Sequence, residues 1–269
     1  MTIVKTESTG ERMIVDHYQS SAEDFVIYLM HVAAYRFAES FVRGRRVLDY
    51  GCGTGYGAAS LAEVATEIVG VDVAAEAIAH ARGHFQRANL RFQQVEAGRA
   101  LPFADGAFDT VLSFQVLEHL SSSTHYLSEV RRVLAPGGCL ILVTPNRQER
   151  LLPMQKPWNR WHVLEYSERT LREALDRYFE SVQIQHMSGK PEVVGVELHR
   201  WRKLKWLTLP ATLPILPDSL RLKLLNGLHA IRRVTARPGS KQEFAFDESD
   251  IFIGHGLEPS LNLVAIART

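Results

Sequence analysis

Glycines at alternate positions constrain the fold of this chain more than any other feature. They lie in RVLDYGCGTGYGAASL, between Arg46 and Leu61, and directly follow a short apolar segment. The glycines are Gly51, Gly53, Gly55 and Gly57. Glycine tolerates positive φ and has no Cβ, so a ligand can come close to backbone N–H groups at the start of a helix. The pattern predicts a buried strand, a ligand-binding turn and a helix in succession.

Two carboxylates indicate what kind of nucleotide-like ligand the turn accepts. The glycines satisfy the GxGxxA dinucleotide fingerprint, but Asp49 at the end of the strand would repel a pyrophosphate. A ligand with cationic groups, such as the ammonium and sulfonium of S-adenosylmethionine, is attracted instead. Asp72 ends the next apolar segment about 20 residues after the first glycine, where a carboxylate can hold ribose hydroxyls. A tight turn without a ligand is the alternative.

These motifs resemble those of class I S-adenosylmethionine-dependent methyltransferases that share VLDxGCGxG. VDVAAEAIAHA is similar to the family's second-strand acidic motif, ALPFADGAFDTVLSFQVLEHL to its fourth-strand region, and VRRVLAPGGCLILVTPN to its fifth-strand motif. The resemblance covers residues 25 to 187 in family order. It implies an S-adenosylmethionine-dependent enzyme with a doubly wound, Rossmann-like α/β fold. Its sheet would have seven strands, mostly parallel, with an antiparallel last strand.

The resemblance also implies a set of residues that contact the cofactor. Asp49 would lie near the ammonium, Asp72 would bind both ribose hydroxyls, and Val73 would pack on the adenine. Glu96 takes the place of the aspartate that often receives the adenine amino group. The full set is Asp49, Gly51, Gly53, Gly55, Asp72, Val73, Glu96, Ala97, Phe114 and Gln115.

Apolar spacing predicts alternating strands and helices, and therefore βαβ units with a parallel sheet. Strands are expected at 46–50, 67–72, 90–95, 109–114, 138–143, 179–186 and 261–267. Helices are expected at 25–42, 56–65, 74–86, 122–134 and 167–177. PGG at 136–138 is predicted to stop a helix and form a turn. Ligands of such sheets bind beyond the carboxyl ends of the strands.

The chain is predicted to divide into four segments. An N-terminal arm and a capping helix occupy 1–45, and a cofactor-binding Rossmann-like domain occupies 46–187. A basic helical insertion follows at 188–258, and the last strand lies in 259–269. A structureless connection as long as the insertion would be unusual, so helices are predicted there at 199–207 and 218–234.

The insertion combines positive charge with tryptophan. Residues 198–241 carry ten Lys or Arg and one acidic residue, Asp218, together with Trp201 and Trp206. A basic amphipathic stretch of this kind can lie on an anionic membrane surface. A helical subdomain with solvated charges is the first alternative, and a homodimer interface is the second. Peripheral membrane contact is therefore one of three open interpretations.

Candidate catalytic residues follow the fourth and fifth strands. His119 comes after Glu118, and His162 lies three residues before Glu165. Histidine titrates near neutral pH and can act as a base toward an acceptor hydroxyl, while a carboxylate can orient its ring. A structural role in the core is the alternative for each histidine. The flanking Trp158 and Trp161 offer either a surface for a sugar ring or the packing of a lid.

A second likeness concerns the acceptor. GYGAASLA and N-x-x-H-V-x-E resemble segments of methyltransferases from glycan and glycolipid pathways, which implies O-methylation of a sugar or natural-product hydroxyl. A quinone or polyketide hydroxyl, an amine, an inactive cofactor-binding scaffold and an NAD-linked oxidoreductase are alternatives. Quinone-pathway members can show ExxEH with a divalent metal. Here Gln115 replaces the first glutamate, so no metal is expected.

Composition limits the remaining classes. The chain of 269 residues suits one α/β domain with an elaboration, and its net charge of +1 gives no overall field for nucleic acid. Cys52 and Cys139 lack metal-ligand spacing, which predicts reduced thiols and a cytoplasmic protein. No segment is expected to be long and apolar enough to span a membrane.

Overall fold

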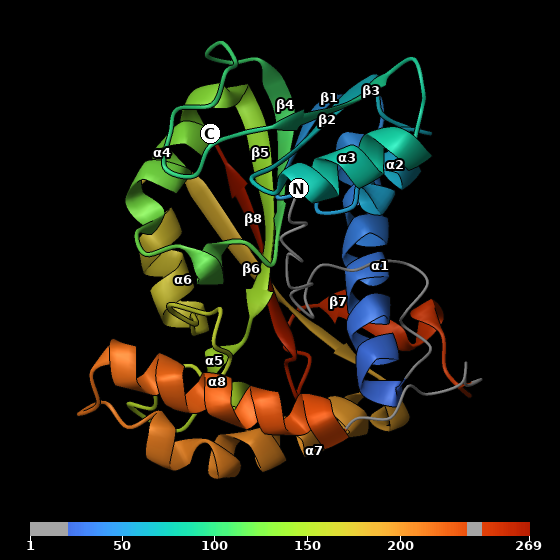
Figure 1. Cartoon of the computed structure of the whole chain (residues 1–269). Helices are drawn as coiled ribbons and strands as arrows, with labels where there is room; N and C mark the ends of the chain where they lie inside the picture. Colours follow the sequence, from blue (N-terminus) through green and yellow to red (C-terminus); the bar gives the residue numbers. More distant parts are fainter. Residues whose placement is uncertain (1–20, 236–243) are drawn as a thin grey trace, which may run out of the picture.

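The centre of the computed structural model is one mixed sheet (Figure 1). The structure describes residues 21–235 and 244–269, without the side chains of 229–235, so the predicted arm over 1–20 lies outside the described residues. The strands are β1 (Arg46–Tyr50), β2 (Glu67–Asp72), β3 (Leu90–Gln94), β4 (Phe108–Phe114), β5 (Leu134–Pro145), β6 (Ser181–Gly189), β7 (Ile251–Gly254) and β8 (Asn262–Arg268). They lie in the order β3-β2-β1-β4-β5-β8-β6-β7.

The strand directions confirm the predicted Rossmann-like α/β fold. β3, β2, β1, β4 and β5 pair in parallel, and β8 inserts antiparallel between β5 and β6. The predicted number of seven strands is wrong, because β7 pairs antiparallel with β6 and adds an eighth strand. β7 has only four residues at the sheet edge, too few for an alternating pattern to reveal it.

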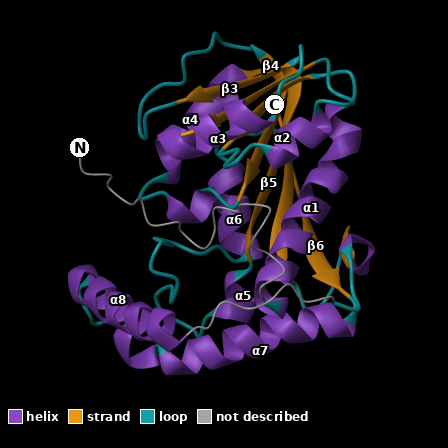
Figure 2. Ribbon diagram, turned by 45° about the vertical axis from the view of Figure 1, so that its right-hand side comes forward, coloured by secondary structure: helices purple, strands orange, loops and turns teal. Residues whose placement is uncertain are grey.

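Helices cover both faces of the sheet. They are α1 (Ala22–Val42), α2 (Tyr56–Leu61), α3 (Ala75–His84), α4 (Ser123–Val133), α5 (Arg147–Arg150), α6 (Glu168–Leu175), α7 (Pro191–Leu207) and α8 (Asp218–Thr235). Short 3₁₀ turns are η2 (Leu117–His119), η3 (Leu209–Ala211) and η4 (Glu248–Asp250). Apolar residues of α1, α2, α3 and α7 form one core, and those of α4 and α6 form the other. The two helices predicted in the insertion are α7 and α8, which lie together at one end of the molecule (Figure 2).

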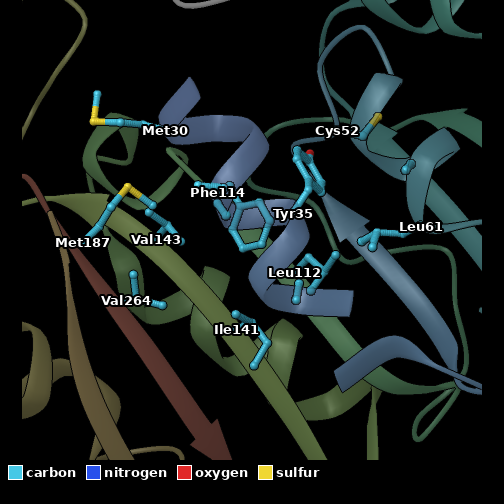
Figure 3. Packing of buried hydrophobic residues seen from close by; sticks show 14 of the residues in the cluster. Met30, Tyr35, Cys52, Leu61, Leu112, Phe114, Ile141, Val143, Met187 and Val264 are labelled. Atoms are coloured by element: carbon cyan, nitrogen blue, oxygen red, sulfur yellow. The ribbon is translucent and has the colours of Figure 1, made fainter. Parts of the chain in front are cut away.

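Helix α1 passes the length and hydropathy criteria for crossing a membrane. It has 21 residues and a mean hydropathy of 1.2, so the expectation that no segment meets these criteria is wrong. Val26, Leu29 and Ala38 of α1 are nevertheless buried in the core, and Tyr35 lies beside Phe114 of β4 (Figure 3). This burial is characteristic of a core helix that packs on a sheet.

The PGG segment does not form a separate turn, contrary to the sequence-based prediction. It belongs to β5, where Leu134 pairs with Phe108 but Cys139 already pairs with Thr110. The extra residues form an irregularity in the pairing, which accommodates a proline that cannot donate a hydrogen bond. β5 consequently begins directly after α4, before the expected start of the strand.

Candidate active site

The glycine loop adopts a backbone that residues with a Cβ would strain. Gly51, Gly53 and Gly55 have φ of +95°, +53° and +84°. A Cβ on Gly55 would lie 2.7 Å from Ala81 and from the ring of Phe92, whereas one on Gly53 would meet nothing within 4 Å. Packing therefore fixes the loop on one side, and space remains open beside Gly53 for a ligand.

Asp49 is a buried carboxylate with one unsatisfied oxygen. Its side chain is 1% exposed, and the hydroxyl of Tyr35 donates to Oδ2 over 3.1 Å. Oδ1 is buried and accepts no hydrogen bond from any described residue. Burial raises the pKa of Asp49 to about 7, although the Tyr35 hydrogen bond opposes the shift. A cationic group would stabilise this carboxylate, so the site fits the ammonium of S-adenosylmethionine.

Asp72 joins the second strand to the glycine loop. Its Oδ2 accepts the N–H of Gly53 over 3.0 Å, and its Oδ1 accepts the N–H of Ala74 over 2.8 Å. A carboxylate has about four lone-pair sites, so capacity remains for two ribose hydroxyls. Val73 beside it is 46% exposed and offers an apolar surface for the adenine.

Phe114 and Gln115 lie at the carboxyl end of β4. Phe114 is buried and packs edge-on against Tyr35, with ring centroids 4.9 Å apart (Figure 3). Gln115 has a φ of +56°, and its N–H donates to the carbonyl of Val143 over 2.8 Å. This left-handed residue turns the chain toward η2 and the candidate catalytic residues.

Glu96 and Ala97 follow β3 near Asp72, but both are exposed. The N–H of Val95 donates to the carbonyl of Asp72, which places the loop at the expected end of the sheet. The side chain of Glu96 is 81% exposed and lies 3.5 Å from Arg99. The adenine contact of Glu96 therefore stays a prediction, because its carboxylate is directed toward Arg99.

The two candidate histidines, which the sequence presents as separate, lie against each other. The ring centroids of His119 on η2 and His162 in the loop after β5 are 5.0 Å apart, with the planes at 84°. Nδ1 of His162 lies 2.8 Å from Oε1 of Glu165, and Nδ1 of His119 lies 3.1 Å from the carbonyl of Trp161. His162 is buried, while His119 is half-buried. Together they form one base-bearing pair.

Arg150 completes this group and was not predicted. Its Nε and Nη2 donate to Oε2 and Oε1 of Glu165 over 3.0 and 3.2 Å. The guanidinium lies 4.3 Å from the ring centroid of Trp158 and 5.2 Å from that of Trp201. Burial alone would raise the pKa of Glu165, but Arg150 and the His162 hydrogen bond lower it to about 2. Glu165 therefore stays ionised, and Trp158 serves to pack Arg150.

The same cluster offers a donor set for a divalent metal. Ligand atoms of Glu118, His119 and His162 all lie within 4.8 Å of one another. Two imidazoles and a carboxylate suit Zn²⁺ or a similar ion, and an oxygen partner at the other ring nitrogen is common for metal-bound histidine. Thr144 orients Glu118 by donating to Oε2 over 3.0 Å. Gln115 replaces the first glutamate of the ExxEH pattern, and His162 could supply the third ligand in its place.

Comparison with known proteins identifies the domain that contains the glycine loop. The profile of the methyltransferase domain matches residues 48–142. A probable S-adenosylmethionine-dependent methyltransferase of Mycolicibacterium smegmatis is 36% identical over 168 residues, which are 62% of this chain and 63% of that protein. A probable S-adenosylmethionine-dependent methyltransferase of Mycobacterium tuberculosis is 35% identical over 158 residues, 58% of this chain and 55% of that protein. Residues 48–142 therefore form a methyltransferase domain of the class I S-adenosylmethionine-dependent kind, and the cofactor of this class is S-adenosyl-L-methionine.

Further similarities are shorter or concern the fold alone. The matches to these mycobacterial relatives span somewhat more than half of their length. A ubiquinone biosynthesis O-methyltransferase of Cereibacter sphaeroides is 35% identical over 41% of this chain and 45% of its own. A solved S-adenosylmethionine-dependent methyltransferase of Thermotoga maritima has a TM-score of 0.57 at 15% identity and covers 91% of each chain. The [4+2]-cyclase SpnF has a TM-score of 0.55 at 21% identity, over 98% of this chain and 84% of its own.

Proposed function

We propose that this protein transfers the methyl group of S-adenosylmethionine to a hydroxyl oxygen of a sugar, glycolipid or other small natural-product acceptor. The observation that carries the proposal is the His119–His162 pair, whose second ring is oriented by an ionised Glu165. This pair follows β4 and β5, and the glycine loop follows the adjacent β1. The carboxyl ends of parallel strands meet at one edge of the sheet, where ligands bind.

Residues of the first two strands would bind and orient the cofactor. Asp49 would neutralise its ammonium, Asp72 would accept its ribose hydroxyls, and Val73 would contact its adenine. S-adenosylmethionine supplies a methyl group that is already activated by the sulfonium. Alignment of the acceptor oxygen with that methyl accounts for much of the expected acceleration.

The histidine pair would remove the proton of the acceptor hydroxyl. Glu165 holds Nδ1–H of His162, so its Nε2 is the nitrogen that accepts a proton. The ionised carboxylate then stabilises the imidazolium that forms. His119 is more exposed and contacts the same ring, so it can receive the acceptor first. Such general-base catalysis contributes typically 10²–10⁴-fold to a rate.

A phenolic hydroxyl of a quinone precursor is the second candidate acceptor. Two observations favour it: the similarity to ubiquinone biosynthesis O-methyltransferases, and the cluster of Glu118, His119 and His162. A divalent metal held there would polarise the hydroxyl in place of a base. Activity that disappears with a chelator and returns with metal would identify this mechanism.

Two further alternatives are tested by ligand binding. The likeness to a cyclase agrees with the general rule that a fold does not fix a reaction, so an inactive or differently active cofactor-binding protein is one alternative. An NAD-linked oxidoreductase is the other, opposed by Asp49. S-adenosylhomocysteine should raise the melting temperature, and NAD should not. Transfer of labelled methyl to a panel of sugar, phenol and amine acceptors then tests the activity. Retention of label in the cofactor with every acceptor would contradict the proposal.

The buried, unpaired Cys52 and Cys139 support a cytoplasmic location as part of this proposal. Fractionation of cells that express the tagged protein would test it. Recovery of the protein in an oxidising compartment, with Cys52 and Cys139 no longer present as free thiols, would contradict it.

A further inference from the structure

Large apolar side chains are exposed mainly at one end of the molecule. Among the described residues, eight of the fourteen exposed large apolar side chains lie between 206 and 228. They are Trp206, Leu207, Leu213, Ile215, Leu220, Leu222, Leu224 and Leu228. We call residues 202–228 the α7–α8 tip, and Figures 1 and 2 show these two helices at the end of the molecule. A concentration of this kind indicates an interaction surface.

The end of α7 alternates cations with apolar groups on its outward face. Trp201 is 1% exposed and marks the face that packs on the core. Arg202 lies four residues before Trp206, and Lys203 four residues before Leu207, so each pair shares one side of the helix. All four are exposed, with Trp206 at 59%. A tryptophan beside cations suits the boundary between water and a lipid phase.

Only part of the apolar face of α8 is buried against the rest of the protein. Arg221 and Leu225 are buried, and Arg221 donates to the carbonyl of Pro157 over 2.8 Å. Leu220, Leu224 and Leu228 run beside them at intervals of four residues and stay exposed. These three leucines therefore leave an uncovered apolar stripe on α8, and Ile215, in the segment between α7 and α8, is 82% exposed.

The charge of the tip is positive. Arg202, Lys203 and Lys223 are exposed, whereas Asp218 is the one acidic residue of this segment and pairs with Lys156. The basic residues of α7 do not all face outward. Arg200 is paired with Glu197, and Lys205 donates to the carbonyl of Glu149 over 2.9 Å. The outward cations match an anionic partner, and the apolar groups between them match a partner with an apolar interior.

We propose that the α7–α8 tip docks on an anionic lipid membrane. Trp206, Leu207 and Ile215 enter the interface, and the exposed cations contact the headgroups. The tip is tied to the loop of the candidate active site, because Arg160 donates to Asn226 over 3.0 Å. Docking therefore brings the acceptor site to the membrane and favours a lipid-linked acceptor. This last step rests on the proposed methyltransferase function, whereas docking itself does not.

Co-sedimentation with phospholipid vesicles tests the proposal on the full chain without cofactor or acceptor. The wild type should bind vesicles that contain phosphatidylglycerol, bind phosphatidylcholine vesicles much more weakly, and dissociate as salt screens the charges. One basic residue near such a surface contributes about fivefold, so Arg202→Gln with Lys203→Gln should weaken binding about twenty-five-fold. Trp206→Ser with Ile215→Ser should weaken binding at least about tenfold. Phe252→Ser and Arg177→Gln, exposed residues outside the tip, are the matched controls and should bind normally.

Two results would overturn the proposal. One is no difference between anionic and neutral vesicles at low salt. The other is a sedimenting mass near twice 30.3 kDa that Trp206→Ser with Ile215→Ser halves, because the tip would then be a dimer interface. Methyl transfer to a soluble acceptor is measured separately. Loss of vesicle binding with transfer retained rejects only the docking, and vesicle binding without transfer rejects only the enzymatic function.

Discussion

Two carboxylates are almost equally buried and have opposite pKa shifts. Asp49 is 1% exposed and Glu165 is 2% exposed. Burial raises the pKa of Asp49 to about 7, whereas the pKa of Glu165 falls to about 2 despite its burial. Asp49 has a neutral partner in the hydroxyl of Tyr35, and Glu165 has the guanidinium of Arg150 and the ring of His162. The partner of a buried carboxylate, rather than its burial, decides whether it is charged.

This difference divides the candidate active site into two halves. The cofactor half contains Asp49, Asp72 and the glycine loop, and the acceptor half contains the two histidines, Glu165 and Arg150. In the acceptor half, both oxygens of Glu165 accept hydrogen bonds from Arg150 or His162, and Arg150 supplies the cation without a ligand. The cofactor half leaves Oδ1 of Asp49 without a hydrogen bond from the described residues, so a ligand must supply the positive charge. We infer that Asp49 selects a cationic cofactor, and that Glu165 positions a base.

The largest expected effect is on turnover. With an acceptor identified, His162→Ala should lower kcat by about 10²–10⁴-fold, because it removes the oriented base. Affinity for S-adenosylhomocysteine should remain, since the cofactor half is unchanged. His119→Ala is the companion variant. Near-normal turnover in both would mean that alignment alone drives the reaction.

Removing the guanidinium of Arg150 should shift the pKa of Glu165 upward, in the direction of the shift of Asp49. Arg150→Gln leaves a buried carboxylate without its ion-pair partner and should lower the free energy of unfolding by about 3–5 kcal/mol. In the wild type, the depressed pKa of Glu165 stabilises the fold above its ordinary pKa, and this stabilisation is lost as pH falls toward about 2. The variant should lose much of that pH dependence in urea unfolding. Adding Glu165→Gln should recover part of the stability; a double variant less stable than Arg150→Gln would contradict this account.

The strands and the glycine loop of the cofactor half could be predicted from the sequence for a physical reason. Gly51, Gly53 and Gly55 need a special backbone that other residues resist, and Asp49 and Asp72 lie at fixed distances from them along the chain. The strands and helices of this half have clear apolar periods. Their positions therefore follow from local rules.

In the acceptor half, the contact between His162 and Glu165 could be predicted because these residues are three apart, but the remaining contacts join distant residues and could not. Arg150 meets Glu165 and Trp201 through the packing of α5, the following loop and α7. Nothing in the spacing around Arg150 indicates an ion pair. The short edge strand β7 and the irregular pairing of β5 also depend on neighbouring strands, so the sequence-based prediction missed them.

A smaller effect is expected at the ribose. Asp72→Ala should weaken S-adenosylhomocysteine binding at least about tenfold, since each charge-assisted hydrogen bond contributes about 1.5–3 kcal/mol. Calorimetry measures the affinity, and the unfolding transition checks that the loop survives the loss of the Gly53 contact. Unchanged affinity would reject the ribose role of Asp72.

The smallest effect is expected at the adenine. Glu96→Ala should weaken binding only about fivefold, because an exposed carboxylate beside Arg99 gains about 1 kcal/mol from one more hydrogen bond. Arg99→Ala is the control, and it should leave affinity unchanged or raise it slightly. Identical affinities for Glu96→Ala and the wild type would remove Glu96 from the cofactor site.

The most direct test of the central claim is the affinity for S-adenosylhomocysteine from about pH 5 to about pH 8 in the wild type and in Asp49→Asn. Below its pKa of about 7, Asp49 is protonated and cannot pair with the ammonium. Wild-type affinity should rise up to about tenfold per pH unit until about pH 7 and then level off. Asp49→Asn should bind weakly and lack this rise. Parallel pH profiles with equal affinities in the two proteins would contradict the assignment of Asp49 as the partner of the cofactor's charge.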